Sequence, residues 1–259
     1  MTINDRVFQP GNKFPVHYRF RAAKRDCNHL LVVMSGFNLP DPTAYDFTHC
    51  LSFCDSHILW IKDDFEGLPA YYLCHNMSFE VEERVSQLIN GVASFLNYPK
   101  TSILGASKGG SMALYYGIKH RMDNIISIVP QFNIGSYVSH GTPWEHVGEK
   151  MMGKINEDNI SRLDNKLIEM VHGAGSINGG VYLFTSPTDH QYESEILPNL
   201  ESLSKLKSFN LILSKSPLIA KHNEVANFNI NLLLSLVYQF EHNISPAWGI
   251  IHNGSGWNE

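Results

Sequence analysis

The stretch TSILGASKGGSMALYYGI, residues 101–118, decides how the rest of the chain is interpreted. At its centre lies GASKG, which matches the pattern G-x-S-x-G and places Ser107 between Gly105 and Gly109. The preceding TSIL is partly β-branched and suits a buried strand, whereas the following SMALYY contains good helix formers and no proline. Strand, sharp turn and helix in this order are typical of a nucleophile elbow.

A serine in such a turn is exposed above a sheet, at the N-terminus of a helix whose dipole favours developing negative charge. The two glycines are expected because the turn is strained and neighbouring backbone packs tightly against it. The alternative is a glycine-rich turn that only joins a strand to a helix. Because both flanks fit the elbow, we predict that Ser107 is a nucleophile.

Length and composition indicate a globular protein. A chain of 259 residues is commonly a single α/β domain with a substantial core. Its content of 43% hydrophobic and 17% charged residues is ordinary for a folded chain. With a net charge of -5 and no run of Lys and Arg, the sequence predicts neither a nucleic-acid partner nor an anionic membrane surface.

The N-terminus is polar and lacks the apolar core of a secretory signal, and the apolar run at 229–237 is too short to span a membrane. The four cysteines, Cys27, Cys50, Cys54 and Cys74, form no C-x-x-C pair, so no metal site is predicted. Cys50 and Cys54 facing each other one helical turn apart is an alternative to free thiols packed in the core. We expect a reduced, cytoplasmic protein.

Strand-like and helix-like segments alternate along the chain. The expected strands are residues 16–21, 29–36, 56–61, 101–104, 124–130, 180–185 and 208–213, and the expected helices are 79–96, 111–116, 193–206 and 224–240. This alternation predicts an α/β fold with a mostly parallel sheet covered by helices on both faces. Residues 131–175 interrupt it, being richer in Gly, Asn, His and Met. We therefore predict one domain, 1–259, with a lid insertion at about 131–175; the tail from residue 245 is unassigned.

A serine hydroxyl needs a base, usually His, which is itself held by a carboxylate. In the α/β-hydrolase fold the order along the chain is Ser, acid, His, and the last two follow later strands. Asp189 follows the strand expected at 180–185, and His222 lies between the strand at 208–213 and the final helix. We predict a catalytic triad of Ser107, Asp189 and His222.

Each partner has an alternative interpretation. The chain contains 13 histidines, so one of them falls near the required loop easily by chance. Asp189 lies in Ser-Pro-Thr-Asp, which is favourable turn chemistry. His190 and Glu193 are nearby alternatives, and Glu224 is an alternative as a cap of the final helix. The ordered occurrence of all three groups, each after its own strand, favours the triad.

An oxyanion hole should use the backbone N–H of Lys108, the residue after the nucleophile. The second donor should come from the loop after the strand that ends at Gly36, and we predict the N–H of Phe37. The Lys108 side chain is expected either to be a solvated charge or to attract a phosphate or carboxylate of the substrate.

Three segments carry a family resemblance. LVVMSGFN at 31–38, GASKGG at 105–110 and ALYYG at 113–117 together resemble bacterial capsular polysaccharide biosynthesis proteins of α/β-hydrolase fold. Within that group they look most like capsule O-acetyltransferases, which move acetyl from acetyl-CoA to sugar hydroxyls through a Ser-Asp-His triad. The SKGG elbow is also similar to one in an accessory secretion component that acetylates sugars on an adhesin. The resemblance extends from about Leu30 to the final helix, without the lid and tail.

Carried over by position, the resemblance implies Ser107 as nucleophile, Asp189 as acid and His222 as base. It also implies acetyl-CoA as acyl donor, no permanently bound cofactor, a polysaccharide or oligosaccharide acceptor, and association with other capsule-synthesis proteins. An esterase or polysaccharide deacetylase with the same triad is the alternative, with water as final acceptor. A non-catalytic scaffold is disfavoured because it has no need of all three groups.

The predicted lid contains the aromatic residues Phe132, Tyr137 and Trp144. Such rings either stack on a sugar or pack the lid onto the domain, and we prefer packing. Lids vary most among proteins of one fold and set the choice of acceptor, so the sequence does not identify the sugar.

Overall fold

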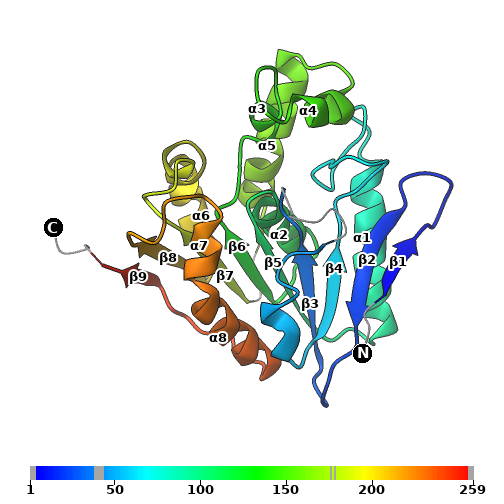
Figure 1. The fold of residues 1–259 in the computed structure, drawn as a ribbon. Coiled ribbons are helices and arrows are strands. Elements are labelled where there is room, and N and C mark those ends of the chain that lie inside the picture. Colours follow the sequence, from blue (N-terminus) through cyan, green and yellow to red (C-terminus); the bar gives the residue numbers. More distant parts are fainter. Residues whose placement is uncertain (1–3, 38–43, 176, 178, 256–259) are drawn as a thin grey trace.

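A computed structural model describes residues 4–37, 44–175, 177 and 179–255 and contains one nine-stranded sheet of order β1-β2-β4-β3-β5-β6-β7-β8-β9 (Figure 1). From β4 to β9 all neighbouring strands are parallel, whereas β1 and β2 are antiparallel additions at one edge. The strands are β1 (Asp5–Phe8), β2 (Val16–Arg21), β3 (His29–Met34), β4 (His57–Ile61), β5 (Lys100–Ala106), β6 (Asn124–Ile128), β7 (Gly180–Thr185), β8 (Phe209–Lys215) and β9 (Ile250–Gly254).

Helices cover both faces of this sheet. One core lies between the sheet and α1, α2, α5 and α6, and the second lies between the sheet and η1, α7 and α8. The helices are α1 (Glu80–Phe95), α2 (Lys108–Lys119), α3 (Ile134–Tyr137), α4 (Glu145–Met152), α5 (Glu157–His172), α6 (Leu200–Ser204), α7 (Glu224–Phe228) and α8 (Ile230–Glu241), with shorter turns η1 (Cys50–Phe53), η2 (Tyr192–Ile196) and η3 (Leu197–Asn199).

The central strand β3 illustrates why both faces are apolar. Successive side chains of a strand point to opposite faces, so a strand covered on both sides is continuously hydrophobic. All six residues of β3 are buried. Leu30, Val32 and Met34 belong to one core, and Leu31 and Val33 belong to the other.

The prediction of one continuous helix at 193–206 is wrong. The chain there forms the π-helical turn η2, the 3₁₀ turn η3 and only then the short helix α6. Pro198 lies in the first turn of η3. Because proline has no N–H and its ring clashes with the carbonyl four residues earlier, a regular α-helix cannot continue through it.

The predicted final helix is also divided, into α7 and α8 at Asn229. The Asn229 side chain is buried; it accepts from Ser214 Oγ at 2.9 Å and donates to Val225 O at 2.8 Å. These bonds tie the break to β8. The unassigned tail contains β9, which pairs in parallel with β8, and the polar N-terminus contains β1.

Residues 131–175 form α3, α4 and α5, with α3 and α4 above the carboxyl ends of the central strands (Figure 1). Helix α5 packs against α2 and α3, and its apolar residues Leu163, Leu167 and Val171 belong to the main core. The helix α5, 16 residues of this segment, is thus part of the main core, and the one-domain-plus-lid organisation stays a prediction.

Two further expectations concern the membrane and the thiols. Within the described ranges, no helix is both long and apolar enough to cross a bilayer. All four cysteines are free thiols, and Cys54 and Cys74 are buried in the two cores.

Candidate active site

Strand β5 leads directly into Ser107, and α2 begins at the next residue. The backbone of Ser107 has φ 55° and ψ −126°, a conformation that non-glycine residues rarely adopt. Its N–H donates to Ile128 O at 2.9 Å, which fixes the turn to β6. Strain of this kind persists where the surrounding structure holds it, and it occurs often at active sites. The strand, turn and helix that the sequence predicts are all present.

The two glycines of the pentapeptide are required by close backbone approach. A Cβ on Gly105 would lie 2.1 Å from Gly109 O, and one on Gly109 would lie 2.2 Å from Met34 O. Both distances are far inside van der Waals contact. The strained φ falls on Ser107, whereas the glycines let α2 pack directly on the ends of β5 and β3.

The predicted acid and base are in contact. His222, in the loop after β8, donates from Nδ1 to Asp189 Oδ2 at 2.7 Å, and Asp189 lies in the loop after β7. The Asp189 side chain is 0% exposed and that of His222 is 16% exposed. The His222 Nε2 atom is buried and has no hydrogen-bond partner among the described residues. An imidazole held in this way presents Nε2 as a proton acceptor.

The alternatives to these residues take other positions. His190 Nδ1 lies 3.3 Å from the second Asp189 oxygen, but its ring is 71% exposed. Glu193 is exposed. Glu224 Oε2 accepts from the backbone N–H groups of Ala220 and Lys221, both at 2.7 Å, and so fixes the loop that carries His222.

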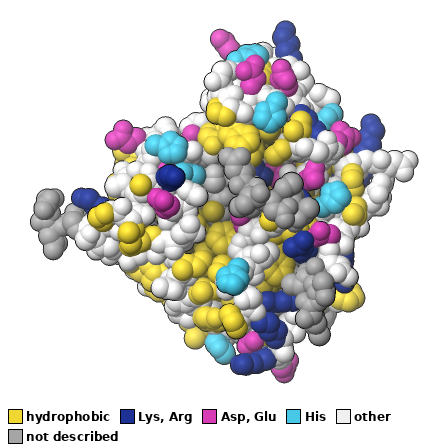
Figure 2. Space-filling view, in the orientation of Figure 1, with side chains coloured by type: hydrophobic (Ala, Val, Ile, Leu, Met, Phe, Trp, Pro, Cys, Tyr) yellow, Lys and Arg dark blue, Asp and Glu magenta, His cyan; other side chains and the backbone are white. Residues whose placement is uncertain are grey.

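Ser107 and His222 line one cleft of about 960 Å³ at the carboxyl ends of the parallel strands. Parallel sheets of this kind bind ligands at that edge. The two side chains share the wall without a direct hydrogen bond in the described part of the chain, and catalytic hydrogen bonds often tighten only when substrate is bound. Figure 2 shows hydrophobic side chains gathered beneath α3 and α4 and, lower on the same face, beside α7 and α8.

Phe37, the predicted second oxyanion donor, also lines this cleft, in the loop that follows β3. The preceding Gly36 donates its N–H to Asp46 Oδ2 at 2.7 Å. Burial raises the pKa of the Asp46 carboxyl, and the Gly36 N–H opposes that effect. The sequence does not predict a role for Asp46, because this residue lies in a loop with no recognisable motif.

Comparisons with known proteins identify the fold that carries this site. No protein-family model matches the chain, and no curated protein sequence matches it significantly. Among solved structures it is similar to the capsule O-acetyltransferase of Neisseria meningitidis serogroup A, with a TM-score of 0.72 and 16% identity over 90% of this chain and 93% of that one. It is also similar to Est1E from Butyrivibrio proteoclasticus, with a TM-score of 0.61 and 10% identity over 92% and 98%.

A mutant of the same capsule O-acetyltransferase has been solved in complex with CoA and gives a TM-score of 0.72 at 15% identity, over 90% of this chain and 94% of that one. Identities this low show the fold alone. The chain has the α/β-hydrolase fold. That prediction is confirmed, and the structural neighbours include the class of capsule enzyme that the sequence resembles.

One expectation about this α/β-hydrolase site is wrong. Lys108 is neither a solvated charge nor free to meet a substrate, since its side chain is 1% exposed and its Nζ lies 2.6 Å from Asp63 Oδ2. Burial lowers the pKa of the Lys108 ammonium, and the Asp63 carboxylate opposes that effect. Asp63 belongs to no motif, and only the packing of α2 against the residues after β4 brings it to Lys108.

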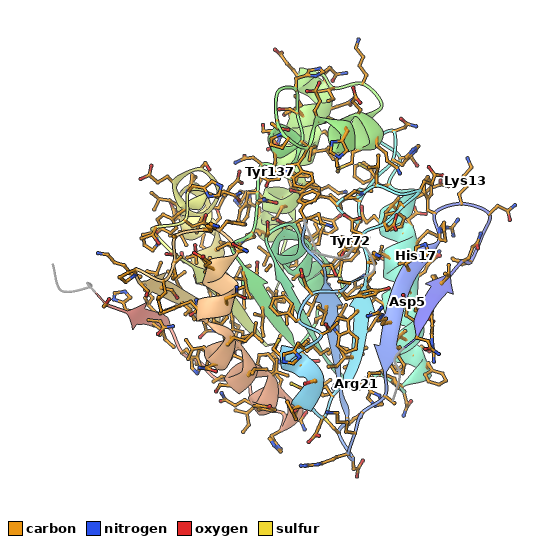
Figure 3. All side chains as sticks on the ribbon, in the orientation of Figure 1. Asp5, Lys13, His17, Arg21, Tyr72 and Tyr137 are labelled. Carbon is orange, nitrogen blue, oxygen red and sulfur yellow. The ribbon has the colours of Figure 1, made fainter. Side chains whose placement is uncertain are left out.

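Aromatic residues of 131–175 pack onto the predicted oxyanion loop. The ring of Trp144 stacks on Phe37 with centroids 4.2 Å apart, and the ring of Tyr137 does so at 6.1 Å. Phe132 is 2% exposed and belongs to the core. This matches the preferred packing interpretation, although Tyr137 and Trp144 also line the cleft. Figure 3 shows Tyr137 between α3 and the carboxyl ends of the strands.

Proposed function

We propose that this protein is a serine acyltransferase that moves acetyl from acetyl-CoA to hydroxyls of a capsular or related bacterial polysaccharide. The observation that carries the proposal is the Asp189–His222 hydrogen bond of 2.7 Å, which leaves Nε2 available at the cleft that Ser107 lines. In this proposal Ser107 is the nucleophile, His222 the general base and Asp189 the group that orients and stabilises the imidazole.

In the first half-reaction, His222 Nε2 takes the Ser107 hydroxyl proton as Oγ attacks the thioester carbonyl. Negative charge develops on the carbonyl oxygen, where the backbone N–H groups of Phe37 and Lys108 would stabilise it. The C–S bond then breaks, the protonated His222 gives its proton to the departing CoA sulfur, and acetyl-Ser107 remains.

In the second half-reaction, a sugar hydroxyl takes the place of CoA. His222 removes the hydroxyl proton as the oxygen attacks the acetyl carbonyl. The bond between the acetyl carbon and Ser107 Oγ then breaks, and the protonated His222 returns its proton to Oγ, which gives the sugar ester, the free serine and the neutral imidazole. A cleft of about 960 Å³ lies at the upper end of the range usual for small-molecule sites, about 300–1,000 Å³, which suits a site visited by two substrates.

An esterase or polysaccharide deacetylase is the second candidate. Structural neighbours that are hydrolases favour it, because the same residues release the acyl group to water if water reaches acetyl-Ser107 first. We propose that residues 131–175 act as a lid that favours the sugar. Its support is the stacking of Trp144 and Tyr137 on the loop beside the cleft.

The test is to incubate the protein with acetyl-CoA and candidate capsular oligosaccharides, and to detect acetylated sugar by NMR. Release of CoA with formation of a sugar ester supports the transferase, whereas release of acetate alone supports the hydrolase. Ser107→Ala should abolish both while the circular dichroism spectrum stays unchanged. Activity that survives in this variant would contradict the mechanism.

A further inference from the structure

The two predicted oxyanion donors lie on separate segments, so something must fix their relative position. The loop after β3 is held at consecutive residues. Ser35 donates its N–H to Tyr72 Oη at 2.8 Å, and the Tyr72 hydroxyl lies 3.1 Å from Ser35 O. Gly36 donates to Asp46 Oδ2 at 2.7 Å. The backbone just before Phe37 therefore has little freedom to shift.

Lys108 connects that loop to the other donor. Its backbone N–H is itself the predicted donor at the start of α2. Its buried ammonium lies 2.6 Å from Asp63 Oδ2, 5.0 Å from the centroid of the Phe37 ring and 4.7 Å from that of the Tyr72 ring. A cation over an aromatic face is attracted by the ring quadrupole. One side chain thus contacts both residues that shape the loop.

Asp63 holds the Tyr72 side of this arrangement. Its Oδ1 atom accepts from the backbone N–H groups of Ala70 and Tyr72, both at 3.0 Å, while Oδ2 binds Lys108. Tyr71 and Tyr72 have φ 52° and φ 54°, two consecutive left-handed residues that are not glycine. Such a backbone persists only where its surroundings fix it, and the two bonds to Asp63 do so.

A contribution to the stability of the fold does not by itself explain why the Asp63–Lys108 ion pair is present. Both side chains are 1% exposed, and removing two charges from water costs free energy that apolar side chains of similar volume avoid. The pair is neutral as a whole, so it does not attract an anionic substrate either. What it does provide is a fixed geometry between the start of α2 and the loop after β3.

We propose that the buried Asp63–Lys108 pair positions the oxyanion hole, holding the N–H groups of Phe37 and Lys108 toward one point through Tyr72 and the Phe37 ring. This inference rests on the proposed serine chemistry. Asp63 and the Lys108 side chain are positioning groups, since they act through the backbone N–H groups and do not touch the reacting atoms.

The test replaces the pair together, as Lys108→Met with Asp63→Asn. Methionine keeps the length and apolar stem of lysine, and asparagine keeps the oxygen that accepts from Ala70 and Tyr72. Acylation of Ser107 is followed with p-nitrophenyl acetate, and the oxyanion hole is probed with methylboronic acid, whose serine adduct is tetrahedral. Both are measured beside the wild type.

We expect kcat for the ester and the affinity for methylboronic acid to fall together, by roughly tenfold to a hundredfold, because misplaced donors stabilise the tetrahedral state less. KM should stay within about twofold of the wild-type value, because ground-state binding is untouched. The midpoint of the pH–rate profile should stay within about half a pH unit, because His222 is untouched. A purely structural role would not produce this pattern.

The matched control is Lys119→Met with Glu82→Gln, which removes the ion pair of Lys119 at the other end of α2 and with it the pair between Glu82 and Lys166. This control should lose about as much thermal stability as the Lys108→Met/Asp63→Asn variant, but its kcat and its affinity for methylboronic acid should stay unchanged. A folded Lys108→Met/Asp63→Asn protein with wild-type kcat and boronate affinity overturns the inference.

If that double variant does not fold, the single variant Tyr72→Phe tests the same inference. It keeps the ring beside Lys108 and removes the hydroxyl, which contacts the backbone of Ser35 and also Ile61 O. Loss of boronate affinity at unchanged KM supports the inference, and wild-type values overturn it. Failure of the proposed function is distinguishable, because there the wild type itself would not be acylated at Ser107 by the ester.

Discussion

Two aspartates lie on either side of the Ser107 elbow, each bonded to a basic side chain, and the two pairs differ in what their proton can do. Asp189 holds His222, whose second nitrogen is a vacant acceptor at the cleft. Asp63 holds Lys108, whose ammonium is enclosed by protein and by two aromatic rings. In the proposed mechanism the first pair passes a proton, whereas the second keeps a charge in place.

The largest expected effect comes from breaking the first pair at the histidine. His222→Ala removes the only group in the proposed mechanism that accepts the Ser107 proton, so kcat with acetyl-CoA should fall by roughly 10⁴-fold or more. Single-turnover assays of acetyl-enzyme formation measure this. Some loss of stability is expected as well, because the variant leaves the buried Asp189 carboxylate without this donor, so circular dichroism must show that the protein is folded. A kcat within tenfold of wild type would show that another base serves Ser107.

Asp189→Asn should lower kcat by roughly 10²- to 10⁴-fold, because an amide in place of the carboxylate favours the wrong imidazole tautomer. The fold should survive, since Asn keeps the volume and one acceptor oxygen. His190, 3.3 Å from the same carboxylate, offers the matched control. His190→Asn should retain activity within a few-fold, and equal losses in the two variants would mean that the two histidines share the role.

Breaking the second pair on one side only should act on stability. Lys108→Met leaves the Asp63 carboxylate buried without its cation, and such a change typically costs about 3–5 kcal/mol of unfolding free energy. Lys108→Met with Asp63→Asn should recover part of that loss, because no uncompensated charge remains. Urea denaturation of both variants measures the difference. Equal stabilities would mean that the carboxylate is not charged in the single variant.

The two pairs also differ in how far the sequence predicts them. Asp189 and His222 follow from order along the chain, because a parallel sheet brings the ends of successive strands to one edge. The contact between their side chains is evident only from the structure. Asp63 and Asp46 carry no motif, since burial and distant contacts give them their character. Lys108 was misjudged for the same reason, as lysine is usually solvated and only the packing of α2 reveals its partner.

The fold shows the same division between local and distant causes. β3 is a continuous apolar run, so its central place is evident from its composition. The break at Asn229 depends on bonds to Ser214 and Asn253 from other strands, which no local pattern predicts. β9 is half exposed at an edge, with weak alternation, and its pairing is set by β8.

A buried histidine at the amino ends of the parallel strands, opposite the candidate site, offers a further comparison. His29, at the start of β3, lies 2.8 Å from both Ser56 Oγ and Ser102 Oγ, and the ring is 1% exposed. No carboxylate contacts it in the described part of the chain. Burial lowers its pKa from 6.5 to about 4, opposed by the charge of Asp123.

Because the folded pKa of His29 lies below the unfolded one, the unfolded chain binds more protons between these values. The neutral ring therefore stabilises the fold fully above about pH 6.5, and this contribution falls as the pH drops toward 4, by roughly 3 kcal/mol in total. His29→Gln, which still donates and accepts, should flatten part of the stability profile in this window. Urea denaturation between pH 4 and 7 measures the difference, and parallel profiles for variant and wild type would show that His29 stays charged or solvated when folded.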